Sequence, residues 1–183
     1  MLIKPSPSLA KEFSENLLKE KIPKLKAEYI LLHSKFVIQA VKDLIERKNL
    51  KFDLKQFEIA GYLHDVGYIF GDENHAEKSL EISRDKFILN SIIEDCILNH
   101  GSSSKPKTQE GKIFQLADKL SIFYPEFVKQ LIELEKQEAI LSDDEILKKI
   151  NKKLKKYLEI FSDKEYQEIA REKYEIGKNI LEN

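Results

Sequence analysis

Hydrophobic residues recur at three- and four-residue spacing along most of the chain, the period of an amphipathic helix. In LKAEYILLHSKFVIQAVKDLI one such stripe is formed by Leu25, Tyr29, Phe36, Val37, Ala40, Val41 and Leu44. The stretch NSIIEDCILNHG repeats the pattern with Ile92, Ile93, Cys96 and Ile97. We see no sustained alternation of apolar and polar residues, no hairpin dipeptide and no internal repeat. The pattern predicts an all-α fold.

Proline and serine residues predict where several helices begin. Residues 1–22 are expected to form a short amphipathic helix behind a proline-containing lead, and Pro23 is expected to start the next one. The stretch GSSSKPKT, residues 101–108, has the composition of a loop. Two pairs have the spacing of capping boxes that open further helices: Ser142 with Glu145, and Ser162 with Glu165.

The positions of the histidines divide the chain into a core and an extension. A length of 183 residues is ample for a sizeable core and suggests one domain over residues 1–183. All 4 histidines lie within residues 24–125, whereas residues 126–183 are rich in Lys and Glu. We therefore expect a single helical domain with its site in residues 24–125 and a helical C-terminal extension over residues 126–183.

Composition limits the cellular compartments and the kinds of binding partner to be expected. The 31 basic and 32 acidic residues give a formal charge of −1, which argues against nucleic acid as the main partner. Cys96 is the single cysteine, so no internal disulfide can form, which fits a reducing compartment. The start MLIKPSPSLA lacks the apolar core of a signal peptide, and no run is long enough to span a membrane. We expect a soluble cytoplasmic protein without a membrane partner, and a homo-oligomer stays open.

Six ligand-type side chains accompany the apolar stripes. They fall on the inward faces of their segments, or beside such a residue: His33, His64, Asp65, His75, His100 and Asp118. A lone histidine on an apolar stripe is usually a core residue with a hydrogen-bond partner. Here all the histidines face inward together with two carboxylates, and burying an unpaired carboxylate costs on the order of several kcal/mol. A divalent metal site between helices would remove these penalties together.

The types of ligand limit the choice of metal. A set of imidazoles and carboxylates suits Fe, Mn, Co, Ni or Zn better than Ca, which prefers oxygen ligands alone. Because the chain has a single cysteine, a thiolate-bound structural zinc is not expected. One or two divalent ions are therefore expected as cofactors, with Mg kept as a further candidate.

The order of these residues resembles the ligand series of the HD-domain metal-dependent phosphohydrolase superfamily, a helical fold named for its His-Asp pair. The series runs His33, His64–Asp65, His75, His100 and Asp118. The words AGYLHDVGY and LADKL resemble the motifs around the pair and around the last aspartate. The similarity covers roughly residues 25–125. The full ordered series at helix-sized separations is far more specific than a bare His-Asp dipeptide.

The resemblance implies a role for each residue of the series. Family members hold one metal with the first His, the His-Asp pair and the distal Asp, here His33, His64, Asp65 and Asp118. Members with two further histidines hold a second metal, here at His75 and His100, with Asp65 bridging. His64 and Asp65 are thereby implied in catalysis. Some members carry a Lys or Glu three residues after the pair's Asp, where this chain has Tyr68, either a core aromatic or a substrate contact.

The resemblance also implies an activity. It is metal-dependent hydrolysis of a phosphate ester or anhydride, with a nucleotide as the favoured substrate, by attack of a metal-activated water. Two divalent ions and two carboxylates leave a net charge of about +2, which attracts phosphate. No P-loop, dinucleotide fingerprint or nucleophile elbow supports another chemistry. Two alternatives stay open: a cyclic-nucleotide-type phosphodiesterase, and a regulatory HD module that binds nucleotide or metal without turnover.

Basic residues near the series are candidates for binding the small phosphorylated substrate. They are Lys105 and Lys107 in the loop after His100, Lys119 beside Asp118, and Arg84. A lysine in a serine-rich loop is often simply solvated, so the loop lysines are candidates because their loop begins at a proposed ligand.

Overall fold

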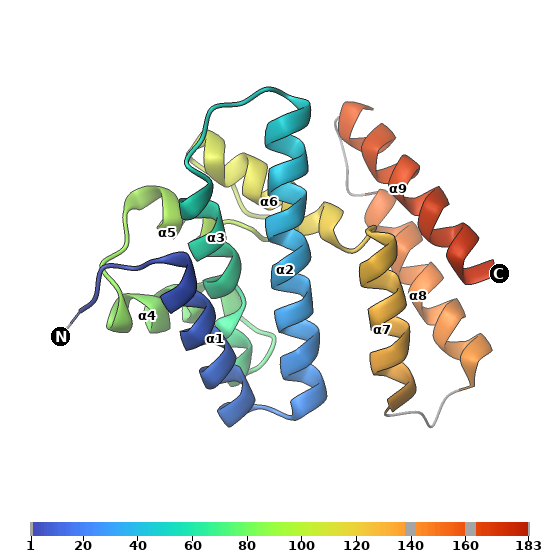
Figure 1. The fold of residues 1–183 in the computed structure, drawn as a ribbon, viewed down its shortest axis with the longest axis horizontal. Helices are drawn as coiled ribbons and strands as arrows, with labels where there is room; N and C mark the ends of the chain where they lie inside the picture. Colours follow the sequence, from blue (N-terminus) through green and yellow to red (C-terminus); the bar gives the residue numbers. More distant parts are fainter. Residues whose placement is uncertain (1, 138–141, 160–163, 183) are drawn as a thin grey trace. The chain divides into compact units, whose positions relative to one another are not determined.

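The computed structural model describes residues 2–137, 142–159 and 164–182. Over these ranges the regular elements are helices, which confirms the predicted all-α fold (Figure 1). The described β-type contact is an isolated parallel bridge between Ile3 and Phe87. Within the same ranges, no helix combines the length and the apolar character needed to cross a membrane.

The chain divides into two compact units, Met1–Asp118 and Lys119–Asn183. The expectation of one domain over residues 1–183 stays a prediction. The first unit contains the helices α1 (Pro7–Lys21), α2 (Lys24–Arg47), α3 (Leu54–Leu63), the short 3-10 helix η1 (Val66–Phe70), α4 (His75–Lys86), α5 (Ser91–Leu98) and most of α6 (Gln109–Ser121).

Three helices at the centre of the first unit pack against one another. α1, α2 and α3 make mutual contacts, α5 packs on α3, and α4 packs on η1 and α5 (Figure 1). The predicted stripe of α2 supplies the core, because Val37, Val41 and Leu44 are buried. Pro23 occupies the N-cap of α2, as its position in the sequence predicts. The helices thus bury their apolar faces where the period of 3.6 residues places them.

The second unit consists of helices that contact one another pairwise: α7 (Pro125–Gln137), α8 (Asp143–Leu158) and α9 (Lys164–Glu182). The Tyr174 hydroxyl of α9 donates to Asn151 Oδ1 of α8 at 2.8 Å. One half of the predicted capping box at the start of α8 is present, since the Glu145 carboxylate accepts from the main-chain N–H of Ser142 at 2.9 Å, whereas the Glu145 N–H donates to the Ser142 carbonyl oxygen at 3.0 Å. The second predicted box begins at Ser162, which lies outside the described residues.

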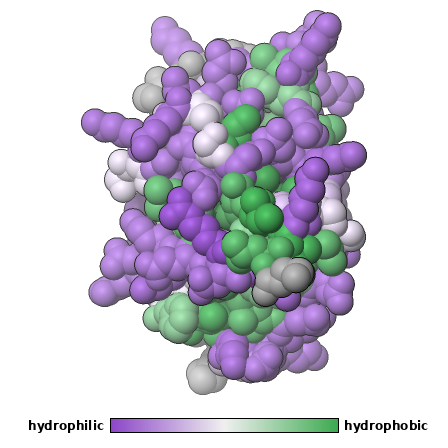
Figure 2. All heavy atoms as spheres, turned by 90° about the vertical axis from the view of Figure 1, so that its left-hand side faces the viewer, coloured by the Kyte–Doolittle hydropathy of each residue, from purple (hydrophilic) through white to green (hydrophobic). Residues whose placement is uncertain are grey.

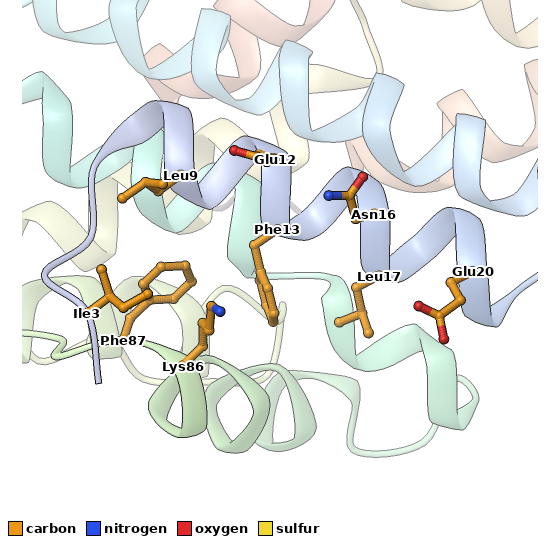
Figure 3. A pocket seen from close by; sticks show the side chains of 9 residues that line it. All are labelled: Ile3, Leu9, Glu12, Phe13, Asn16, Leu17, Glu20, Lys86 and Phe87. Carbon is orange, nitrogen blue, oxygen red and sulfur yellow. The ribbon is translucent and has the colours of Figure 1, made fainter. Parts of the chain in front are cut away.

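A groove lies between α1 and the residues at the end of α4 (Figure 3). Its volume is about 320 Å³, and its lining mixes apolar side chains (Ile3, Leu9, Phe13, Leu17 and Phe87) with polar ones (Glu12, Asn16, Glu20 and Lys86). Figure 2 shows hydrophobic residues gathered beside hydrophilic ones on one face of the molecule. The groove lies apart from the polar residues singled out in the sequence, none of which lines it.

Candidate metal centre

The His-Asp pair lies where one helix ends and the next begins. His64 is the C-cap of α3 and donates its main-chain N–H to Ala60 at 2.8 Å. Asp65 follows at φ −112° and ψ 7°, as the N-cap of η1. This change of backbone direction directly after α3 leaves both side chains buried, with His64 0% and Asp65 5% exposed.

Two glycines allow the helices around the pair to approach closely. A Cβ atom on Gly61 would lie 2.5 Å from Ile38 Cγ1, so α3 meets α2 at this point. A Cβ atom on Gly67 would lie within 2.1 Å of the His75 carbonyl oxygen, so η1 rests directly on the start of α4. The main-chain N–H of Gly67 also donates to the buried Ser79 hydroxyl at 2.8 Å. The glycines of GYLHDVGY therefore bring His33 and His75 within reach of the pair.

One group of donor atoms gathers beside one oxygen of Asp65. Asp65 Oδ2 lies 3.3 Å from His64 Nε2 and 3.7 Å from His33 Nε2. Asp118 Oδ1 lies 2.8 Å from His33 Nε2 and 3.7 Å from His64 Nε2. The ligand atoms of His33, His64 and Asp118 all lie within 4.8 Å of one another. Helices α2, α3 and α6 thus contribute to one cluster.

A second group gathers beside the other oxygen of Asp65. Asp65 Oδ1 lies 3.4 Å from His100 Nε2 and 3.6 Å from His75 Nε2. The two Nε2 atoms of His75 and His100 are 2.9 Å apart. The Asp65 carboxylate therefore lies between two groups of imidazoles, with one oxygen toward each.

Hydrogen bonds to the main chain set the orientation of the imidazoles. Three donate from Nδ1 to the carbonyl three residues earlier: His64 to Gly61 at 2.9 Å, His75 to Asp72 at 3.2 Å and His100 to Ile97 at 2.7 Å. A carbonyl oxygen only accepts, so each Nδ1 carries a proton and each Nε2 faces the cluster. His64 Nε2 is fully buried and has no hydrogen-bond partner among the described residues. This donor set fits divalent metal ions.

The charges of the cluster shift the pKa values of its members. Burial alone lowers the pKa of His64, but the carboxylates of Asp65 and Asp118 outweigh burial and raise that pKa above its ordinary value. Burial alone raises the pKa of Asp65, yet His64 and His100 hold it well below its ordinary value. Burial, joined by the charge of His100, lowers the pKa of His75. Asp65 is therefore an anion and His75 a neutral imidazole near neutral pH, the forms that bind metal.

The basic residues proposed for substrate binding lie in different surroundings. Lys105 and Lys107 are exposed in the loop between α5 and α6. Arg84 donates from Nε and Nη2 to the Glu94 carboxylate at 2.7 Å each, so it already holds a carboxylate. Lys119 is partly exposed and is the first residue of the second unit. Their roles stay predictions.

Asp95 was not singled out in the sequence, although it fastens the loop that follows His100. Its carboxylate accepts from the N–H groups of Lys107 and Thr108, from the Thr108 hydroxyl at 2.6 Å and from Asn99 Nδ2 at 2.7 Å. The Thr108 hydroxyl in turn accepts from Gly111 N–H at 2.9 Å, as an N-cap of α6. The sequence could have indicated Thr108 as a helix N-cap, because it directly precedes α6. Nothing in the sequence indicates that Asp95, 13 residues earlier, is its partner.

The fold and the cluster together define a class: helical proteins whose inward-facing histidines and aspartates are placed to hold a metal ion. The family model of the HD domain matches residues 30–122, and the chain belongs to the HD-domain family. The match covers the whole series from His33 to Asp118 and confirms the resemblance seen in the sequence. A search of curated proteins and a search of solved structures found no match.

Proposed function

We propose that the chain is a phosphohydrolase that uses water to cleave a phosphate ester or anhydride of a nucleotide. Membership of the HD-domain family supports the class of reaction. The observation that carries the proposal is the Asp65 carboxylate, which turns one oxygen toward His33 and His64 and the other toward His75 and His100. Such an arrangement suits a carboxylate that bridges two cations.

The proposed ligands divide into two sets that share Asp65. His33, His64, Asp65 and Asp118 would hold one ion. His75 and His100, with Asp65, would hold the other. When bound, divalent ions supply Lewis-acid activation of water and stabilise the attacking and leaving oxygens of phosphoryl transfer.

The protein residues orient these groups and limit access of water. The main-chain carbonyls of Gly61, Asp72 and Ile97 fix three imidazoles, so little reorganisation is needed on binding. Phe114 is fully buried and packs edge-on against His64, with ring centroids 5.5 Å apart. Lys105 and Lys107 lie in the loop that starts after His100 and are proposed to attract the substrate phosphates.

The test begins with metal analysis of the purified chain, where we expect about two divalent ions per chain. A panel of nucleotides, including mono- and triphosphates, dinucleoside polyphosphates and cyclic nucleotides, is then assayed for hydrolysis with Mn²⁺, Co²⁺, Ni²⁺ or Mg²⁺. Protein treated with EDTA serves as the control and should be inactive until metal is restored. Metal uptake without turnover of any phosphate ester or anhydride would favour the regulatory module instead.

A further inference from the structure

Lys26 lies on the face of α2 that carries His33. The two residues are seven positions apart, which is two helical turns, or about 10 Å along the axis. The Lys26 side chain is 42% exposed, whereas the His33 side chain is 12% exposed. The helix therefore runs from the buried cluster to a cation at the surface.

Tyr68 connects Lys26 with the cluster. The Tyr68 ring stacks on the imidazole of His75, with centroids 4.3 Å apart and planes 8° from parallel. Lys26 Nζ lies 5.4 Å from the centroid of the same Tyr68 ring. Side-chain contacts thus connect Lys26 at the surface through Tyr68 to His75 in the cluster.

The Lys26 ammonium pairs with the carboxylate of Asp72 at the surface. Lys26 Nζ donates to Asp72 Oδ1 at 3.1 Å, and the Asp72 side chain is 82% exposed. Exposed pairs of this kind contribute little to stability, so another anion can replace the carboxylate at small cost. The main-chain carbonyl of Asp72 accepts from His75 Nδ1, which ties the position of this pair to the cluster.

We infer that Lys26, steadied by the Tyr68 ring, binds a second anionic group of the substrate and so selects a di- or polyphosphate chain over a phosphate monoester. The inference rests on the proposed function, because the first phosphate must lie at the metal cluster. The ammonium exchanges the Asp72 carboxylate for the distal phosphate, and the Asp72 side chain competes with substrate.

The test measures binding of inorganic phosphate and of tripolyphosphate to the Mn²⁺-loaded full chain by calorimetry, at equal free Mn²⁺. Lys26→Met keeps the apolar stem over Tyr68 but removes the charge, and should weaken tripolyphosphate binding about tenfold while phosphate binding stays within about twofold. Asp72→Asn should tighten tripolyphosphate binding severalfold. Where turnover is measured, Lys26→Met should raise KM for a nucleoside triphosphate by a larger factor than it lowers kcat.

Lys24→Met is the matched control, because Lys24 lies on the same turn of α2 and forms an exposed pair with Glu28 at 3.7 Å. The inference is overturned when Lys26→Met binds both probes like Lys24→Met, or loses equal affinity for both. The metal content of the same samples distinguishes failure of the proposed function from failure of the inference. If the wild-type chain does not bind Mn²⁺, both are overturned. If it binds Mn²⁺, the comparison of the two probes tests the inference alone.

Discussion

At the scale of single residues, the cluster depends on how each ring nitrogen is used. His64, His75 and His100 give Nδ1 to the main chain, which leaves Nε2 of each for the cluster. Asp65 contributes to both groups of imidazoles because its oxygens point in different directions. Removing the Asp65 carboxylate should therefore affect both groups, whereas removing His75 and His100 should affect one.

Asp65→Ala should abolish hydrolysis, with a loss of at least about a thousandfold, because both proposed ions lose a ligand. The far-ultraviolet circular dichroism of the variant should stay close to that of the wild type, since the helices bury their apolar faces independently of this carboxylate. Steady-state kinetics and circular dichroism check both parts. Asp85→Ala, at an exposed position of α4, is the control. Near-normal turnover of Asp65→Ala would exclude the proposed site.

Replacing both His75 and His100 with Gln should lower the metal content from about two ions to about one. Turnover should fall by a large factor, because half of the stabilisation of the attacking and leaving oxygens is lost. Inductively coupled plasma analysis and single-substrate kinetics measure the two effects. If the metal content stays the same and only KM rises, these histidines contact substrate instead. Unchanged metal and unchanged kinetics would show that the second site does not exist.

At the scale of elements, the connection between α5 and α6 decides whether His100 and Asp118 can meet at one site. Asp95 near the end of α5 binds the main chain at residues 107 and 108, just before α6 begins. Gln115 of α6 donates to the carbonyl of Ser104 at 3.1 Å and to that of Gly101. Hydrogen bonds therefore hold the loop of residues 101–108 at both ends, although its composition alone suggests a flexible loop.

Asp95→Asn should destabilise the fold by about 1.5–3 kcal/mol at pH 7, because the bonds are made to a charged carboxylate. Burial alone raises the pKa of Asp95, but the bonds from Thr108, Lys107 and Asn99 lower it below its ordinary value. A lowered folded-state pKa gives stability that is present above the ordinary carboxyl pKa of about 3.9 and is lost as the pH falls below it. Urea unfolding of wild type and variant should thus differ at pH 7, and the difference should shrink as the pH falls below about 3.9. Equal stability at pH 7 would contradict the assigned role.

At the scale of the whole molecule, the proposed ligands all belong to the unit Met1–Asp118, and Asp118 is its last residue. The second unit has its own buried residues, among them Phe127, Val128 and Ile169. Metal binding to the cluster should therefore stabilise the unit that contains α1 to α5. The ion binds the folded cluster, and the unfolded chain has no such cluster to bind it.

Mn²⁺ at about a hundred times its dissociation constant should raise the free energy of unfolding by about 2.7 kcal/mol. Thermal melts of the full chain with Mn²⁺ and with EDTA measure the effect as a shift in Tm. Asp65→Ala should reduce that shift strongly, since it lacks the shared carboxylate. A shift of the same size in the variant would place the stabilising ion elsewhere.

Much of the architecture could be predicted from the sequence, because a helix buries one face at a fixed period of 3.6 residues. The stripe of α2, the start of α2 at Pro23 and the half of the capping box present at the start of α8 are all properties of neighbouring residues. The same period assigned His33 and Asp118 to inward faces, and the order of the series identified the HD-domain family. The assignment of each residue to a particular ion stays a prediction.

The sequence by itself determined the helical fold, the family and the set of inward-facing histidines and aspartates, because each follows from spacing along one segment or from the order of motifs. Only the tertiary structure decided which distant residues meet. Lys26 contacts Asp72, 46 positions away in the sequence, and Asp95 contacts Thr108, 13 positions away. The helical period relates only residues within one helix, so it does not predict these contacts. The two oxygens of Asp65 and the stacking of Tyr68 on His75 likewise depend on how closely η1 approaches α4, which the missing side chain of Gly67 permits.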